Sequence, residues 1–110
     1  GPGILERGAL GSCLAIAYSQ QAAVQGIAID RIEVDVESDF DARPMLHLSD
    51  EPPGFKRLKY NVYIESPESE SKIMRLIEEA DQHSPVLDDF RRAIPVERAV
   101  EIKTRTGELR

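Results

Sequence analysis

The segment from Gly8 to Ile16 most constrains this fold, because a helix through it would be apolar or small on every side. It contains the run Ala9-Leu10-Gly11-Ser12-Cys13-Leu14-Ala15 and lies in a proline-free stretch from about Ile4 to Gln25. This composition, rich in Ala, Leu, Gln and Ile, predicts a long helix that ends at Gly26. A helix without a polar face must be covered on all sides.

Two alternating segments follow the predicted helix. Ile32, Val34 and Val36 alternate with charged residues, and Leu58, Tyr60, Val62 and Ile64 do the same further along. This period of two predicts two strands, and we expect them to pair as antiparallel neighbours. The stretch 39–54 between them contains three prolines and predicts a loop, with residues 45–48 as a candidate extended piece.

Two Ser-Pro pairs carry the signal for a helix start. Ser66-Pro67 and Ser84-Pro85 each offer a hydroxyl cap followed by proline at the first helical position. The first predicted helix has an apolar stripe made of Ile73, Leu76, Ile77 and Ala80. The second runs to about Ala93 and is expected to bury Val86, Leu87 and Phe90. From 96 to 104 the chain alternates again and predicts a last strand, with Val100 and Ile102 inward.

A chain of 110 residues predicts a single α+β domain over residues 1–110. Residues 1–3 are typical of a protease-cleavage remnant and lie outside the fold prediction. Three strands and two short amphipathic helices offer one apolar face, whereas the first helix needs cover all round. We therefore expect an obligate homodimer with the long helices at its centre, in a chain trimmed at its N-terminus.

Composition excludes several classes of function. A net charge of −6 argues against a nucleic-acid partner, and no apolar run approaches the about 20 residues that span a membrane. The single cysteine cannot form an internal disulfide, which fits a reducing cytoplasm. With two isolated histidines, the sequence carries no metal signature, and no cofactor is expected.

Cys13 is the one residue at which thiol chemistry could occur. Its neighbours Leu14, Ala15 and Ile16 are typical of a buried, inert thiol that packs as a small hydrophobe. The wider pattern favours a second interpretation.

Several segments together resemble the OsmC/Ohr family of osmotically induced and organic-hydroperoxide-resistance proteins. They are Ala9–Ala15, Gly26-Ile27, Arg31–Val36, Pro53-Gly54-Phe55 and Glu78–Val86, and the resemblance extends from Leu5 to about Ile102. It implies an OsmC-like fold with a long buried central helix, antiparallel strands, a second helical segment and an intertwined homodimer. It also implies thiol-dependent reduction of organic hydroperoxides in oxidative-stress defence, with a lipoyl-type dithiol as reductant. Family members usually begin with additional strands before the cysteine helix.

The resemblance makes Cys13 the candidate peroxidatic cysteine, and the chain departs from the family around it. Ser84 stands where peroxidase members have a resolving cysteine, so an external thiol would be needed. The family's carboxylate, about ten residues before the cysteine, is replaced by Gly3. Glu6 lies two helical turns before Cys13 and is a candidate substitute. The family's catalytic arginine comes from upstream strands, and Arg7 is expected to point away from the thiol.

The remaining polar residues are interpreted as structural. Ser84 is expected to cap a helix, His83 to be exposed, and His47 to be incidental. Tyr60 and Phe90 are expected in the core. The acids that we expect on a solvated helix face are Glu68, Glu70, Glu78, Glu79 and Asp81.

Two functions follow as rival hypotheses. The first is a one-cysteine peroxidase that reduces a small apolar hydroperoxide and is regenerated by an external dithiol. The alternative is a non-catalytic module that binds an apolar acyl ligand at the dimer interface, with Cys13 only lining the pocket. A third hypothesis is that the chain is a structural remnant with neither activity.

Overall fold

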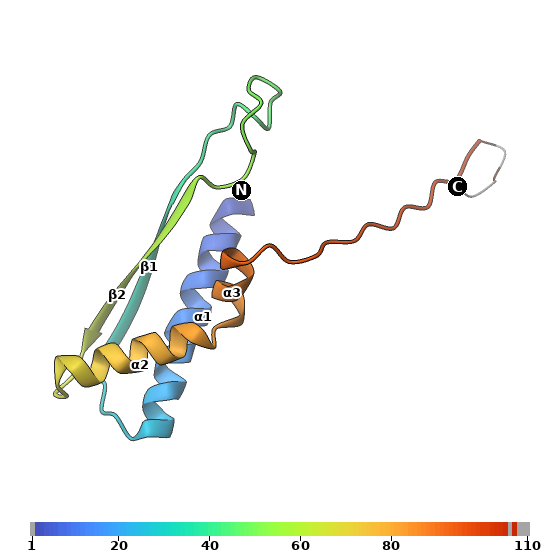
Figure 1. The fold of residues 1–110 in the computed structure, drawn as a ribbon. Helices are drawn as coiled ribbons and strands as arrows, with labels where there is room; N and C mark the ends of the chain where they lie inside the picture. Colours follow the sequence, from blue (N-terminus) through green and yellow to red (C-terminus); the bar gives the residue numbers. More distant parts are fainter. Residues whose placement is uncertain (1, 106, 108–110) are drawn as a thin grey trace.

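The computed structural model describes residues 2–105 and 107 and has a long helix beside a two-stranded hairpin (Figure 1). The hairpin runs along α1, α2 crosses α1, and α3 packs next to α1. This confirms an α+β fold with a long N-terminal helix, two antiparallel strands and two further helices. The elements are α1 (Pro2–Gln25), β1 (Arg31–Asp39), β2 (Arg57–Glu65), α2 (Glu70–Gln82) and α3 (Pro85–Arg91).

Helix α1 buries a single stripe of residues spaced four apart. Leu10, Leu14, Tyr18 and Ala22 are at most 4% exposed and face the rest of the chain. Gly11 is also buried, and a Cβ there would lie 3.4 Å from Val36 of β1, so glycine allows the helix and strand to approach closely. The helix ends as predicted at Gly26, which adopts a left-handed backbone with φ 67°.

The hairpin confirms the predicted antiparallel pairing. Val34 lies opposite Val62, and Val36 lies opposite Tyr60. Because side chains alternate along a strand, the apolar residues of both strands are half-buried against the helices while their charged neighbours are exposed. The hairpin thus forms one wall of the core.

The long loop between the strands contains no extended piece, so the candidate strand at 45–48 is wrong. Residues 43–47 form consecutive turns, in which the Leu48 N–H donates to the Arg43 carbonyl over 2.8 Å. His47 adopts a left-handed backbone with φ 62°, which breaks any strand. Phe40 and Phe55 close the base of the loop edge to face, with ring centroids 6.3 Å apart.

Helix α2 begins one turn later than predicted. Ser69, not Ser66, is the cap and accepts a hydrogen bond from the Lys72 N–H. The Ser66 hydroxyl instead donates to the Ala28 carbonyl over 2.6 Å and accepts from the Glu68 N–H, which holds Ser66 in a turn at the end of β2. The predicted apolar stripe is confirmed, because Leu76 and Ala80 are buried.

Helix α3 begins at its predicted cap, Ser84, and ends at Arg91. Leu87 is buried, but Phe90 is 38% exposed, so its assignment to the core is wrong. With only seven residues, α3 turns one face toward α1, and Phe90 lies at the edge of that contact.

The predicted last strand does not form within the chain. Residues 92–102 belong to no helix or strand and extend away from the body; we call this segment the arm (Figure 1). Its apolar side chains Ile94, Val96, Val100 and Ile102 are 40–86% exposed. An alternating segment becomes a strand only beside a partner, and this segment extends away from both β1 and β2 (Figure 1).

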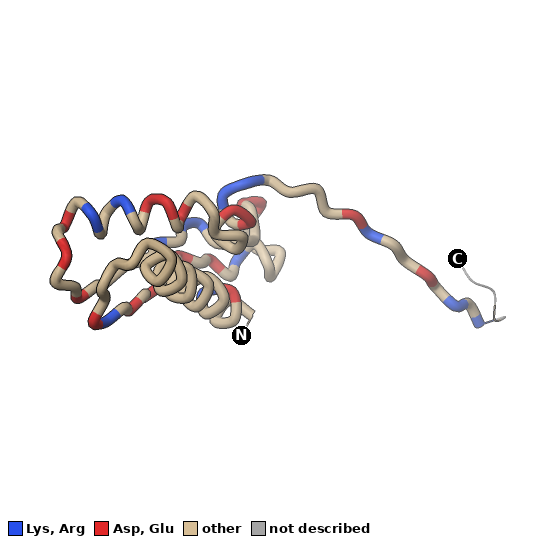
Figure 2. The backbone as a smooth tube through the Cα atoms, turned by 90° about the horizontal axis from the view of Figure 1, so that it is seen from below, with Lys and Arg blue, Asp and Glu red and all other residues tan. Residues whose placement is uncertain are grey.

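The described chain leaves much apolar surface uncovered. Its accessible surface is 8592 Å², against about 6,100 Å² for a compact monomer of this mass. Its radius of gyration is 19.8 Å, where about 13 Å is typical of a compact domain. Ile4, Leu5 and Ile16 of α1 remain exposed, so the helix that we expected to be buried all round is buried on one side. Beyond Glu6 and Arg7 near its start, α1 contains no Lys, Arg, Asp or Glu (Figure 2).

Candidate functional site

Cys13 and Ser84 meet where α1 contacts the start of α3. The Cys13 Sγ lies 3.6 Å from the Ser84 Oγ, although the two residues are 71 positions apart in sequence. Cys13 is half-buried, whereas Ser84 is 2% exposed. The thiol is therefore accessible from one side and faces a buried hydroxyl on the other.

Ser84 is fixed by the cap that it makes. Its Oγ accepts a hydrogen bond from the Leu87 N–H over 3.4 Å, and its own N–H donates to the Asp81 carbonyl over 3.3 Å. A serine hydroxyl has one proton to donate and two lone pairs to accept. Because the Leu87 N–H occupies a lone pair, the hydroxyl proton remains available to a thiolate at Cys13. Ser84 thus serves as the predicted cap and also contacts the sulfur.

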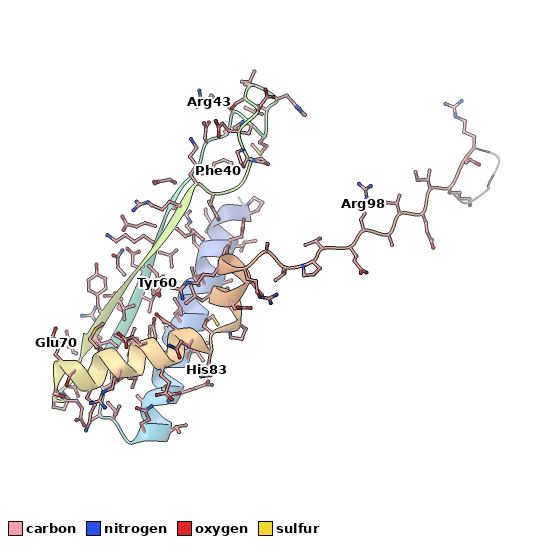
Figure 3. The ribbon with its side chains drawn as sticks, in the orientation of Figure 1. Phe40, Arg43, Tyr60, Glu70, His83 and Arg98 are labelled. Atoms are coloured by element: carbon pink, nitrogen blue, oxygen red, sulfur yellow. The ribbon has the colours of Figure 1, made fainter. Side chains whose placement is uncertain are left out.

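A shallow recess of about 440 Å³ opens at Cys13. Among the described residues, its lining contains no Lys, Arg, Asp or Glu, and His83 is its one titratable side chain besides the thiol. His83 is exposed, as predicted, at the junction of α2 and α3 (Figure 3). The lining residues are Ala9, Ser12, Cys13, Ile16, Ala17, Gln20, His83 and Pro85.

Glu6 and Arg7 lie elsewhere. Glu6 is exposed and lines a separate recess of about 480 Å³ with Tyr60 and Arg91, so the chain does not bring Glu6 and Cys13 into one recess. Arg7 donates to the Gly3 carbonyl and to the Ser38 hydroxyl of β1, which agrees with its expected direction away from the thiol. A catalytic role for Glu6 stays a prediction.

Asp81 does not lie on the solvated helix face predicted for it, and neither does Glu68, which is half-buried and precedes α2. Asp81 is half-buried, and its two carboxylate oxygens accept hydrogen bonds from Tyr18 and Tyr60, each over 2.6 Å. Arg91 donates to the Tyr60 hydroxyl over 3.3 Å. The spacing of four residues between Asp81 and Ile77, a member of the apolar stripe of α2, was the available signal. Asp81 therefore does not belong to a solvated face.

The two tyrosines act as hydrogen-bond donors in this cluster. Burial, and then the hydrogen bond to the Asp81 carboxylate, raise the pKa of Tyr18 well above its ordinary value. The same causes raise the pKa of the half-buried Tyr60. Both phenols thus stay protonated at neutral pH and hold Asp81 between α1 and β2.

A protein-family model matches most of the chain. The model of OsmC, described as OsmC-like protein, matches residues 2–98. The chain belongs to the OsmC-like family. This family consists generally of peroxide-reducing stress proteins.

A solved structure agrees with that membership. The crystal structure of an OsmC-like protein from Mycoplasma pneumoniae superposes with a TM-score of 0.73 at 21% identity, and the match covers 83% of the present chain. At this identity the likeness establishes the fold. The match covers 62% of the length of the Mycoplasma chain. No curated protein matches the sequence significantly.

Within this OsmC-like fold, the described residues offer neither a metal centre nor a membrane span. No group of three or more His, Cys, Asp or Glu residues in the described part of the chain could hold a metal ion. In the same part, no helix is long and apolar enough to cross a bilayer.

Proposed function

We propose that this OsmC-like protein is a one-cysteine thiol peroxidase that reduces organic or fatty-acid hydroperoxides. The contact of 3.6 Å between the Cys13 Sγ and the buried Ser84 hydroxyl carries the proposal. A peroxidatic cysteine must react as a thiolate, and a fixed hydroxyl donor stabilises the charged form. The recess leaves the thiol open to a hydroperoxide, whereas an inert core cysteine would be closed off.

The reaction balances with the Cys13 sulfur as the only protein atom that is oxidised. The thiolate attacks the terminal oxygen of the hydroperoxide, the O–O bond breaks, and the alkoxide takes up a proton and leaves as the alcohol. Cys13 is thereby oxidised to a sulfenic acid. Because Ser84 cannot form a disulfide, an external thiol attacks the sulfenic sulfur and releases water.

A dithiol of the lipoyl type is the reductant that we propose. Its first thiol forms a mixed disulfide with Cys13, and its second thiol then displaces the Cys13 thiolate and closes a cyclic disulfide. The sum converts hydroperoxide and dithiol into alcohol, water and disulfide. The half-buried Cys13 leaves one side of the sulfur open to such a reagent.

The lining of the Cys13 recess supports an apolar substrate. Ala9, Ile16, Ala17 and Pro85 present hydrocarbon next to the thiol. Each methylene that a substrate buries there contributes about 0.8 kcal/mol, which favours alkyl hydroperoxides over hydrogen peroxide.

The assembly that we propose is the intertwined homodimer. The accessible surface in excess of a compact monomer is about 2,500 Å² per chain, or about 5,000 Å² for two copies, at the upper end of the range that obligate dimers bury. The exposed side of α1 and the apolar residues of the arm would supply that surface. A second copy would also cover Ile16 at the edge of the Cys13 recess.

One observation favours the alternative, a non-catalytic module that binds an acyl ligand. Among the described residues, no Lys or Arg lines the Cys13 recess, so the cation that would stabilise a thiolate is missing from the chain's own lining. In that case Cys13 only lines an apolar pocket.

The consumption of cumene hydroperoxide with dihydrolipoamide as reductant distinguishes the two functions. We expect turnover that requires Cys13 and is abolished in Cys13→Ser, with cumene hydroperoxide consumed faster than hydrogen peroxide. If both proteins consume no hydroperoxide and both bind a fluorescent fatty acid equally, the alternative holds and the peroxidase proposal fails.

A further inference from the structure

Asp81 ties the end of α2 to two other elements. Its Oδ1 accepts from the hydroxyl of Tyr18 on α1, and its Oδ2 accepts from the hydroxyl of Tyr60 on β2, both over 2.6 Å. Tyr18 is 0% exposed, and Tyr60 lies between the hairpin and the helices (Figure 3). Phenol-to-carboxylate hydrogen bonds of this length are among the stronger ones in proteins. The direction of α2 at Asp81 is therefore fixed from two sides.

Asp81 is also linked directly to Ser84. The Ser84 N–H donates to the Asp81 carbonyl over 3.3 Å, at the turn where α2 gives way to α3. Helix α1 thus contacts this turn at two levels, through Tyr18 to Asp81 and through Cys13 to Ser84. Cys13 and Tyr18 are five residues apart, about 7.5 Å along the helix axis. Both contacts therefore join α1 to the same turn between α2 and α3.

We propose that Asp81 is a positioning residue that acts on Cys13 through Ser84. The inference rests on the proposed function, in which the Ser84 hydroxyl donates to the Cys13 thiolate. The Sγ to Oγ distance of 3.6 Å leaves little room for displacement before that hydrogen bond is lost. Asp81 itself contacts neither the sulfur nor the recess at Cys13.

A purely structural role for Asp81 predicts something different. Helix α2 has its own apolar anchors in Leu76 and Ala80, which are buried without help from the carboxylate. Loss of the carboxylate would then reduce stability and leave the reactivity of the folded thiol unchanged. Reactivity, measured on folded protein, therefore separates the two roles.

The test is a double-mutant cycle on the alkylation of Cys13 by iodoacetamide, measured from pH 6 to pH 10 without hydroperoxide. Asp81→Asn keeps the size of the side chain and removes its charge. We expect Asp81→Asn to slow alkylation at neutral pH by about three- to tenfold and to move the pH–rate profile to higher pH. In a Ser84→Ala background, the same substitution should add no further change.

Glu79→Gln is the matched control. It lies on α2 two residues earlier and also replaces a carboxylate by an amide, but Glu79 is exposed and bonded to Gln25. Its profile should equal that of the unmodified protein.

Two results would overturn the proposal: an unchanged profile for Asp81→Asn, or a shift of equal size in the Ser84→Ala background. Circular dichroism checks that each variant is folded. Should Asp81→Asn be unfolded, Tyr60→Phe takes its place, because it removes one donor from Asp81 and keeps the buried Tyr18 contact. It must then shift the profile in the same direction. Failure of the peroxidase proposal would leave this cycle interpretable, since alkylation needs no hydroperoxide.

Discussion

The Ser84 Oγ lies 3.6 Å from the Cys13 Sγ and at the same time caps α3 through the Leu87 N–H. One buried hydroxyl therefore links the only thiol of the chain to the start of a helix. In the OsmC-like family, as the resemblance implies, a resolving cysteine stands at the position of Ser84. Because the Ser84 Oγ contacts the Cys13 Sγ, the correspondence between Ser84 and the resolving cysteine can be tested by substitution.

Ser84→Cys should create a redox-active pair. The introduced thiol replaces an oxygen already in contact with the Cys13 Sγ, so treatment with cumene hydroperoxide should yield an intramolecular disulfide. Mass spectrometry would detect the loss of two hydrogens per chain, and the closed loop of about 70 residues should add up to about 4 kcal/mol of stability. The control is the same substitution combined with Cys13→Ser. Two thiols that stay reduced under these conditions would contradict the contact.

Ser84→Ala should separate the capping role from the role at the sulfur. Removal of a helix cap lowers the free energy of unfolding by about 1 kcal/mol. Ser69→Ala is a matched control, because Ser69 caps α2 and lies outside the Cys13 recess. Both variants should lose similar stability in urea titrations, but only Ser84→Ala should alter alkylation of Cys13. Equal alkylation of both variants would show that the hydroxyl does not act on the thiol.

Stability should fall at alkaline pH because of Tyr18 and Tyr60. Burial and the hydrogen bond to Asp81 raise the pKa of both phenols in the folded protein above the value of about 10 that unfolded tyrosine has. Above pH 10 the unfolded chain releases these protons and the folded chain retains them, so the contribution is complete below pH 10 and is lost as pH rises.

Urea unfolding at pH 8 and pH 11 measures this loss. Tyr18→Phe removes the more strongly shifted phenol and should decline less steeply between the two pH values than the unmodified protein. It should also be less stable by about 2 kcal/mol at pH 8, because it takes one donor from the Asp81 carboxylate. An identical decline in both proteins would argue against the raised pKa of Tyr18.

Much of the fold was predictable because local patterns encode it. The alternation of Ile32, Val34 and Val36 with charged residues determines which face of β1 is buried, and the neighbouring strand supplies the matching face. Gly26 and Ser84 likewise act through their own backbone geometry and neighbours. These signals depend on a few adjacent residues, so sequence suffices to read them.

The errors fall where the outcome depends on distant residues. Ser66 and Ser69 both fit a cap, and the Ala28 carbonyl, 38 residues from Ser66, decides between them. The sequence around Asp81 is typical of an exposed acid, and only the hydrogen bonds from Tyr18 on α1 and Tyr60 on β2 show that Asp81 is half-buried. The proximity of Cys13 and Ser84 followed from the family resemblance, and no local pattern encodes it.

The arm offers the sharpest test of the proposed dimer. Ile94, Val96, Val100 and Ile102 are 40–86% exposed, and their even spacing would put them on one face if the arm formed a strand against a second copy. Arg98 lies in the middle of this segment (Figure 3). Val100→Asp would place a charge on that face, whereas Ala99→Asp places the same charge on the opposite one. Sedimentation should give a dimer for the unmodified protein and for Ala99→Asp, and a monomer for Val100→Asp. A well-folded monomer for all three would contradict the proposed assembly.

The most direct test of the proposed chemistry is the trapping of a sulfenic acid on Cys13. The full chain is treated with one equivalent of cumene hydroperoxide in the presence of dimedone, digested and analysed by mass spectrometry, with Cys13→Ser as control. We predict a single dimedone adduct at Cys13, formed only with hydroperoxide. A thiol that iodoacetamide still alkylates fully after this treatment, without any adduct, would contradict the assignment of Cys13 as the peroxidatic residue.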